Sequence, residues 1–182
     1  MSLDTQFHGL PALACAMVLA AGVVLPSGPA GSVEIGDTPP DYLGKTTKGA
    51  EIWLSESAGK IRIVTFWATW CAPCIKELPV LNAVQMKGGA DRIQVVAVNI
   101  NDRKNDFRRA LRVLDDYEIE FVFDRKKKVS TAYDVEGIPH MLIVDVDGRV
   151  AFRHIGYSEE AIPKIVAEIN ELLVKNNLTG AD

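Results

Sequence analysis

Two cysteines separated by two residues are the most reactive feature of the sequence. Cys71 and Cys74 fall where a β-branched and aromatic run ends and a helical pattern begins. Residues three apart on a helix share one face, with Cβ atoms about 5–6 Å apart, so the two sulfurs are near enough to form a disulfide. This spacing suits reversible thiol–disulfide exchange, a passive disulfide or the capture of a metal ion.

The position at a helix start favours the redox use. Free N–H groups and the positive end of the helix dipole stabilise a thiolate at Cys71, so we expect its pKa to fall below that of a free cysteine. We expect Cys74, one turn further, to be less exposed and to act as the resolving thiol. Pro73 falls in the first turn, where a missing N–H costs little. A passive disulfide is disfavoured, because closing so short a loop constrains the unfolded chain by only ~2 kcal/mol.

Other uses of the pair have less support. A structural zinc site needs four ligands, and the histidines His8, His140 and His154 are scattered, with no second CxxC motif. Haem attachment through CxxCH is excluded because Ile75 follows Cys74. Capture of copper by the two thiols stays open. We therefore expect no metal site and no cofactor beyond the Cys71–Cys74 pair itself.

The composition of the chain favours some classes of protein and disfavours others. The chain has 182 residues, 48% hydrophobic and 24% charged, with 20 basic and 24 acidic side chains and a net charge of −4. This fits one globular domain, and the mild acidity disfavours nucleic acid as a partner. Three cysteines are too few for a disulfide-stapled scaffold.

The amino-terminal segment indicates export. Residues 10–25 are uncharged and mostly apolar, shorter than the about 20 residues of a membrane span but suited to the core of a secretory signal. Asp4 and the absence of Lys or Arg from residues 1–9 depart from the usual positive start. We predict a signal peptide or short membrane anchor over 1–30 and one domain over 31–182; a buried amino-terminal helix is the alternative. Cys15 is interpreted as a small apolar residue within this segment.

Strand and helix patterns then alternate. The hydrophobic periodicity predicts, in order, strands at Ala50–Leu54 and Ile61–Ala68, a helix at Ala72–Met86 ended by Gly88-Gly89, a strand at Ile93–Ile100, a helix at Asp102–Asp116, an edge strand at Phe121–Phe123, a short helical turn at Val129–Tyr133, strands at Met141–Asp145 and Val150–His154, and a helix at Glu159–Val174. Two βαβ-like steps followed by a hairpin predict an α/β fold with a mixed central sheet. We expect helices on both faces and an amino-terminal hairpin extension.

Three segments together resemble the TlpA/ResA type of thioredoxin-fold protein. They are Phe66–Cys74, Glu77-Leu78-Pro79 and Gly137-Ile138-Pro139, and the similarity runs from about residue 33 to 175. The resemblance implies a thioredoxin fold and a thiol–disulfide oxidoreductase. It also implies that Pro139 is cis and lies against the cysteine pair, while Ile138 can pair with an extended substrate strand.

Glu77 is the expected acid–base group. Cytosolic thioredoxins typically carry a buried aspartate six residues before the first cysteine, and here that position is Thr65, which cannot serve as a base. Glu77 follows Cys74 by three residues, so a partly buried carboxylate there could deprotonate Cys74 during exchange. The alternative is an ordinary solvated helix glutamate.

The remaining site residues are expected to contact the substrate. Trp70 should border the reactive sulfur, with Ala72, Pro73 and Ile138 beside it. Trp67 is interpreted as core, and His140 first as the start of a strand and second as a residue that tunes the thiols.

The resemblance implies an exported reductase, in the bacterial periplasm, soluble or membrane-anchored. Its expected partners are cysteine-containing exported proteins, as in cytochrome c maturation or copper-site assembly, and a membrane thiol-electron donor; we expect a monomer. An oxidising, disulfide-introducing protein and a copper-binding chaperone that uses the same thiols are the alternatives. Peroxidase activity is disfavoured because no T-x-x-C context appears.

Overall fold

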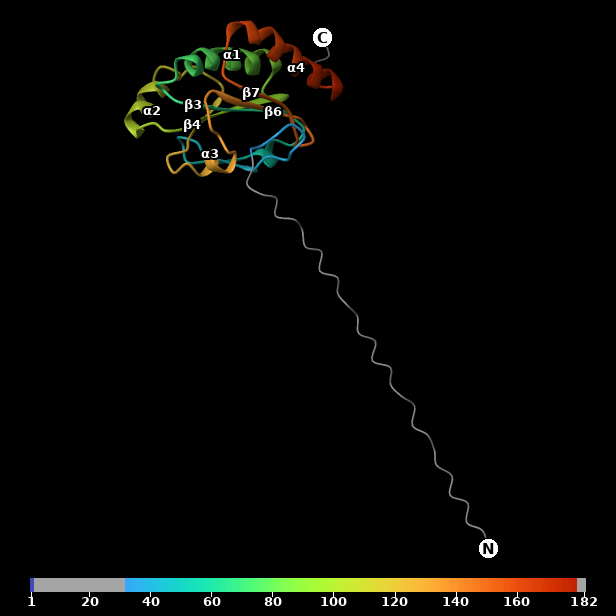
Figure 1. The fold of residues 1–182 in the computed structure, drawn as a ribbon. Coiled ribbons are helices and arrows are strands. Elements are labelled where there is room, and N and C mark those ends of the chain that lie inside the picture. Colours follow the sequence, from blue (N-terminus) through green and yellow to red (C-terminus); the bar gives the residue numbers. More distant parts are fainter. Residues whose placement is uncertain (2–31, 180–182) are drawn as a thin grey trace.

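Seven strands and four α-helices follow one another in the computed structural model, which describes residue 1 and residues 32–179 (Figure 1). The strands are β1 (Tyr42–Lys45), β2 (Glu51–Trp53), β3 (Ile61–Trp67), β4 (Ile93–Asn99), β5 (Glu120–Phe123), β6 (His140–Val144) and β7 (Val150–Ile155). The helices are α1 (Ala72–Gly88), α2 (Lys104–Leu111), α3 (Lys128–Ala132) and α4 (Ile162–Lys175), with 3₁₀ turns at Leu54–Ser57 and Glu159–Ala161. The order agrees with the predicted one.

Five strands form one mixed sheet in the order β5-β4-β3-β6-β7. β3 pairs in parallel with β4, and β4 with β5, whereas β6 and β7 join as antiparallel strands. Every residue of the central strand β3 is buried, including the polar Arg62 and Thr65. The rest of the strand is apolar, as expected for a strand covered on both faces. The mixed sheet predicted from the sequence is confirmed, and β5 is the expected edge strand.

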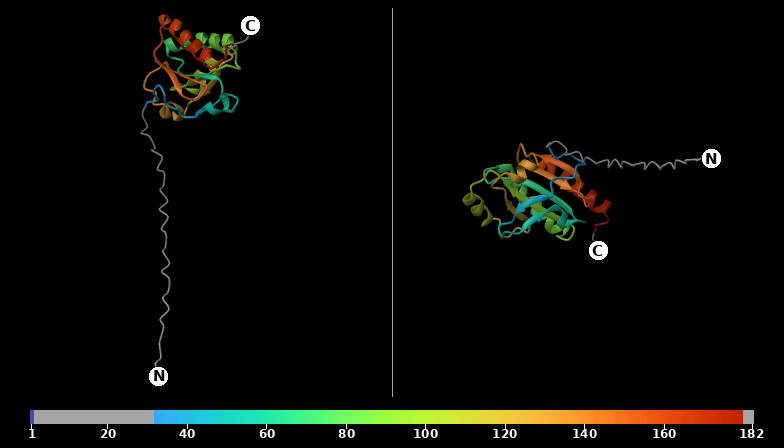
Figure 2. Two further views of the ribbon diagram at one scale, coloured as in Figure 1. Left: turned by 90° about the vertical axis from the view of Figure 1, so that its right-hand side faces the viewer. Right: turned by 90° about the horizontal axis from the view of Figure 1, so that it is seen from below.

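Alternate residues of β3 face two different hydrophobic layers. Ile63 and Trp67 pack with α1 and α4, whereas Val64 and Phe66 pack with α3 and the β1–β2 hairpin. Figure 1 shows α1 and α4 together on one side of the sheet and α3 on the other, and Figure 2 shows the same layers from the side and from below.

The main site helix, α1, begins where its sequence predicts and ends two residues later than expected. Cys71 is its N-cap and a proline lies in its first turn. Gly89, at φ 85°, ends it by donating its N–H to the Gln85 carbonyl, two residues later than predicted. Gly88 is needed in the last turn because a Cβ there would come within 2.2 Å of the Ile93 side chain.

Two predicted helices are wrong at their boundaries. The helix expected over Asp102–Asp116 spans only Lys104–Leu111. Asp102 stays outside because its carboxylate accepts hydrogen bonds from other loop residues, and two aspartates at the carboxyl end would oppose the helix dipole. The last helix starts at Ile162 after a 3₁₀ turn, with a proline in its first turn.

The predicted signal or anchor over 1–30 and Cys15 lie outside the described residues, apart from Met1. Within residues 32–179, no helix has both the length and the apolar character that a membrane crossing requires.

Candidate active site

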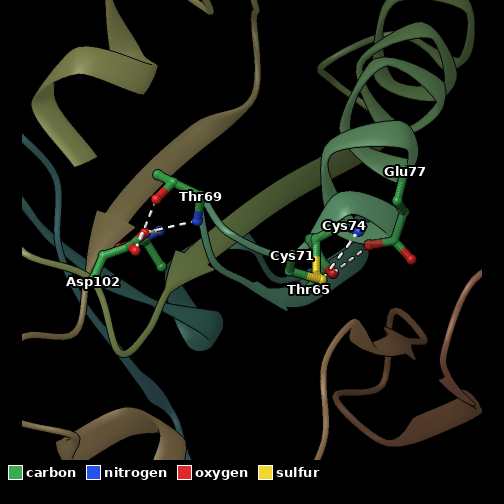
Figure 3. Close-up of a disulfide and its surroundings, with 7 residues drawn as sticks. Thr65, Thr69, Cys71, Cys74, Glu77 and Asp102 are labelled. Atoms are coloured by element: carbon green, nitrogen blue, oxygen red, sulfur yellow. Dashed lines mark hydrogen bonds between the residues drawn. A yellow bond between two sulfur atoms is a disulfide. The ribbon is translucent and has the colours of Figure 1, made fainter. Parts of the chain in front are cut away.

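A disulfide joins Cys71 and Cys74 at the start of α1 (Figure 3). The chain leaves β3, turns so that the Cys71 N–H donates to the Ala68 carbonyl, and enters the helix. The Cys71 sulfur accepts a 3.2 Å hydrogen bond from the Cys74 N–H, and the Cα atoms lie 5.2 Å apart. The Cys74 N–H, which has no partner within the helix, thus points at the Cys71 sulfur and can stabilise a thiolate there.

The two sulfurs differ in access to solvent. Cys71 is 5% exposed and Cys74 is fully buried. The lower exposure predicted for Cys74 is confirmed, and Cys71 is the less buried of the two cysteines. That Cys71 reacts first and Cys74 resolves stays a prediction. Ala72 and Pro73, between the cysteines, are exposed.

Glu77 lies on the same helical face as Cys74, one turn further along α1. It is only 2% exposed, and its Oε2 accepts a 2.6 Å hydrogen bond from the Thr65 hydroxyl (Figure 3). Burial raises the pKa of Glu77 from 4.5 to about 7, and the hydrogen bond from Thr65 offsets part of that rise. The alternative of a solvated helix glutamate is wrong, because the sheet and helix cover this carboxyl group.

Asp102 holds the loop that precedes the disulfide. Its carboxylate accepts hydrogen bonds from the Thr69 N–H at 2.8 Å, the Thr69 hydroxyl at 2.9 Å and the Asn99 side-chain amide at 2.7 Å (Figure 3). These bonds join the end of β4 to the residues before Trp70 and Cys71. Asp102 could not be recognised as a loop anchor from local sequence pattern, because its partner Thr69 is 33 residues away.

The two tryptophans before the cysteines occupy opposite environments. Trp67 is fully buried, with its ring centroid 5.8 Å from that of Phe121 and 6.2 Å from that of Phe107. Trp70 is 62% exposed beside Cys71 in the chain. Trp67 is thus a core residue as predicted, and Trp70 is free to contact another protein.

The Ile138–Pro139 peptide bond is cis, as the resemblance implies. Pro139 is buried, and the half-buried Ile138 packs against the hydrophobic layer that contains both cysteines. Across residues 32–179, no backbone hydrogen bond uses the N–H or carbonyl of Ile138. These two groups can therefore accept an added extended strand.

His140 begins β6, as predicted, and faces away from Glu77. It lies across from Phe66, with ring centroids 6.0 Å apart, and its Nε2 accepts a 3.3 Å hydrogen bond from Arg153. Burial, and then the Arg153 guanidinium, lower the pKa of His140 to about 4 against the opposing effect of Glu34. His140 is therefore neutral at neutral pH.

The described part of the chain holds no group of three or more His, Cys, Asp or Glu side chains placed to bind a metal ion. The chemistry that the site supports directly is thiol–disulfide exchange. The cysteine at the helix start is slightly exposed, the second cysteine is fully buried, and a titratable carboxyl group lies one turn away.

Known proteins are similar to this chain in sequence and in architecture. The AhpC/TSA family model matches residues 35–153. The thioredoxin-like protein YneN of Bacillus subtilis is 33% identical over 125 residues, 68% of this chain and 73% of YneN. The thiol-disulfide oxidoreductase ResA of Geobacillus kaustophilus is 31% identical over 121 residues, 65% of this chain and 68% of ResA.

Solved structures agree on the fold. A crystal structure described as the thiol:disulfide interchange protein DsbE from Chlorobium tepidum is 31% identical, with a TM-score of 0.72 over 78% of this chain and 99% of that one. StoA from Bacillus subtilis, at 23% identity, superposes with a TM-score of 0.58 over 72% of this chain and 98% of StoA, which bears on the fold alone. The predicted thioredoxin fold is confirmed.

Proposed function

The chain belongs to the AhpC/TSA family and is a thiol–disulfide oxidoreductase of the ResA/DsbE type; from this premise we propose that it is exported and reduces disulfides in particular partner proteins. The observation that carries the proposal is the pairing of an accessible Cys71 at a helix start with a buried Cys74 and Glu77 on one face of α1. The cysteine pair is the whole redox centre of the proposed reaction.

The reaction begins with the reduced dithiol. The Cys71 thiol loses its proton to solvent, and the resulting thiolate attacks one sulfur of the partner's disulfide to form a mixed disulfide. The partner's first thiolate is expelled and takes up a proton from solvent. Glu77 accepts the proton of the Cys74 thiol, and the Cys74 thiolate attacks the Cys71 sulfur. This step forms the Cys71–Cys74 disulfide and releases the partner's second thiolate. The two protons of the enzyme's thiols end on the partner's thiols, so two electrons and two protons are transferred.

Glu77 suits the proton step because its pKa lies near neutral pH. A carboxyl group with a pKa of about 7 is present in both protonation states under physiological conditions. It can therefore take a proton from Cys74 and return it within one cycle. Thr65 keeps the carboxylate oriented through its hydrogen bond.

The charge of Glu77 supports the reductive direction. Strong oxidants of this general kind have a stabilised reduced form, as in DsbA at about −120 mV. A carboxylate one turn from Cys74 has the opposite effect, because it disfavours a thiolate on either cysteine. A less stable thiolate makes the reduced pair a better electron donor.

Partner binding is proposed to use the surface around Cys71. The exposed Trp70 supplies apolar contact. The N–H and carbonyl of Ile138, which make no backbone hydrogen bond within residues 32–179, pair with an extended segment of the partner. The partners are proposed to be exported proteins with cysteine pairs, such as apocytochromes or copper-site proteins. A membrane thiol carrier would return the monomeric enzyme to its dithiol form.

Single-turnover kinetics tests the proposal. Reduced protein mixed with a disulfide-bonded peptide should yield two peptide thiols and oxidised protein, while Cys71→Ser should yield neither. Anaerobic titration with Cu(I) is the companion measurement. Tight copper binding without thiol exchange would replace the proposal with the chaperone alternative.

A further inference from the structure

A groove of about 500 Å³ opens directly beside the cysteine pair. One wall is the first turn of α1, and the other is the loop between β7 and α4. The lining residues are Ala72, Pro73, Lys76, Tyr157, Ser158, Glu159 and Glu160. Because Ala72 and Pro73 are the two residues between the cysteines, the groove lies close to any protein that is bound at Cys71.

The groove carries an excess of negative charge. Lys76 and Glu159 form a 3.5 Å ion pair, but their side chains are 66% and 71% exposed, so the pair is weak. Glu160 takes part in no ion pair of the described residues. One lysine against two glutamates leaves a net charge of −1 in the groove.

Glu160 is held in its ionised form. Glu160 is exposed, and interactions with its own main-chain N–H and with the Ser158 hydroxyl lower the pKa of Glu160 below its usual 4.5. The uncompensated charge is thus present across the physiological pH range. It lies in the loop segment that faces Ala72 and Pro73 across the groove.

Tyr157 adds an aromatic surface to this acidic groove. It is partly buried, and burial together with the carboxylates of Glu159 and Glu77 raises the pKa of Tyr157, so the phenol stays neutral. An aromatic ring beside carboxylates attracts a guanidinium or ammonium group through both cation–π and charge-assisted contacts.

We propose that this groove binds a lysine or arginine side chain that the substrate carries close to its reactive cysteine, with Tyr157 and Glu160 as the specificity-determining residues. This inference rests on the proposed function and names the chemistry of its substrate. The groove extends from Ala72 to Lys76, which is about 6 Å along a helix. An extended chain advances about 3.3 Å per residue, so the basic residue would lie about two positions from the substrate's cysteine.

Three disulfide-bonded peptides test the proposal. They differ only in carrying Arg, Gln or Glu two residues outside each cysteine. The full-length reduced protein should reduce the Arg peptide about tenfold faster than the Glu peptide at low salt, with a smaller gap at high salt. Glu160→Lys should reverse this order. Glu171→Lys makes the same charge change on α4 outside the groove and should keep the wild-type order.

Equal rates for the three peptides, or an unchanged order in Glu160→Lys, would overturn the groove proposal while leaving the reductase function intact. If the protein reduces none of them, the same peptides are offered as dithiols to the oxidised protein. A preference for the Arg peptide there would keep the groove proposal and reject the reductive direction. Reaction with none of the peptides in either direction would overturn both.

Discussion

The Thr65 hydroxyl donates a 2.6 Å hydrogen bond to Oε2 of Glu77, joining the middle of β3 to the second turn of α1. Both side chains are buried. The contact places a titratable group inside the layer that also holds Cys74. A carboxyl group so placed is stable when protonated and costly when ionised, and this difference connects stability, pH and redox chemistry in the protein.

Glu77 should make the oxidised protein less stable as pH rises. Its pKa is about 7 in the folded state against 4.5 ordinarily, so the folded state binds this proton more tightly. The contribution to stability is complete below pH 4.5 and is lost as pH rises through about 7. The full shift corresponds to about 3 kcal/mol of unfolding free energy.

Urea unfolding of Glu77→Gln measures this effect. Between pH 4.5 and 8, the wild-type protein should lose about 3 kcal/mol relative to the variant. Glu171→Gln, on the exposed face of α4, controls for the loss of one carboxylate. Parallel pH curves for wild type and Glu77→Gln would show that Glu77 titrates normally.

Thr65→Val should raise the pKa of Glu77 above about 7. The substitution removes the Thr65 hydrogen bond that lowers this pKa and keeps a similar shape. Carbon-13 NMR titration of labelled glutamate reads the pKa directly. Thr69→Val removes a hydroxyl that bonds Asp102 instead, so it should leave the Glu77 titration unchanged. A downward or absent shift in Thr65→Val would contradict the assigned role of the hydrogen bond.

The sequence predicted α1 and its neighbours because local rules act there. Cys71 at a helix start, Pro73 in the first turn and Gly89 at the end each suit their positions. A partly buried Glu77 was expected from its place one turn after Cys74, but its hydrogen bond from Thr65 was not, since Thr65 is twelve residues away on another element.

The other features that could not be predicted from the sequence depend on contacts between loops. Asp102 was assigned to a helix because charged residues continue the helical pattern on both sides. In the structure Asp102 instead accepts hydrogen bonds from Thr69, a contact that only the completed sheet brings together. Tyr157 and Glu160 likewise share a groove with Ala72 and Pro73 only because the β7–α4 loop packs against α1.

Asp102→Ala should lower stability by about 1–3 kcal/mol, since it leaves the Thr69 N–H and the buried Asn99 amide without their acceptor. It should also change the rate at which iodoacetamide alkylates Cys71 in the reduced protein, because the loop before Trp70 loses its anchor. Asp106→Ala removes only an exposed 3.7 Å pair with Arg109 and should change stability by less than about 0.5 kcal/mol. Equal thermal unfolding of the two variants would rule out an anchoring role for Asp102.

The two cysteines should be distinguishable by trapping. Reduced Cys74→Ser mixed with a disulfide peptide should accumulate a mixed disulfide at Cys71, since no second thiol can resolve it. Cys71→Ser should trap little or none, because Cys74 is fully buried. Intact-mass spectrometry at fixed times separates these outcomes. A trapped adduct at Cys74 would reverse the proposed roles.

The reduction potential of the Cys71–Cys74 pair tests the central claim most directly. Tryptophan fluorescence in thiol–disulfide buffers can follow the equilibrium, because Trp70 directly precedes Cys71 and Trp67 packs in the same layer. We expect a potential at or below about −250 mV, in the range of thioredoxin, as a reductase requires. A value near about −120 mV, like that of DsbA, would contradict it and make the protein an oxidant.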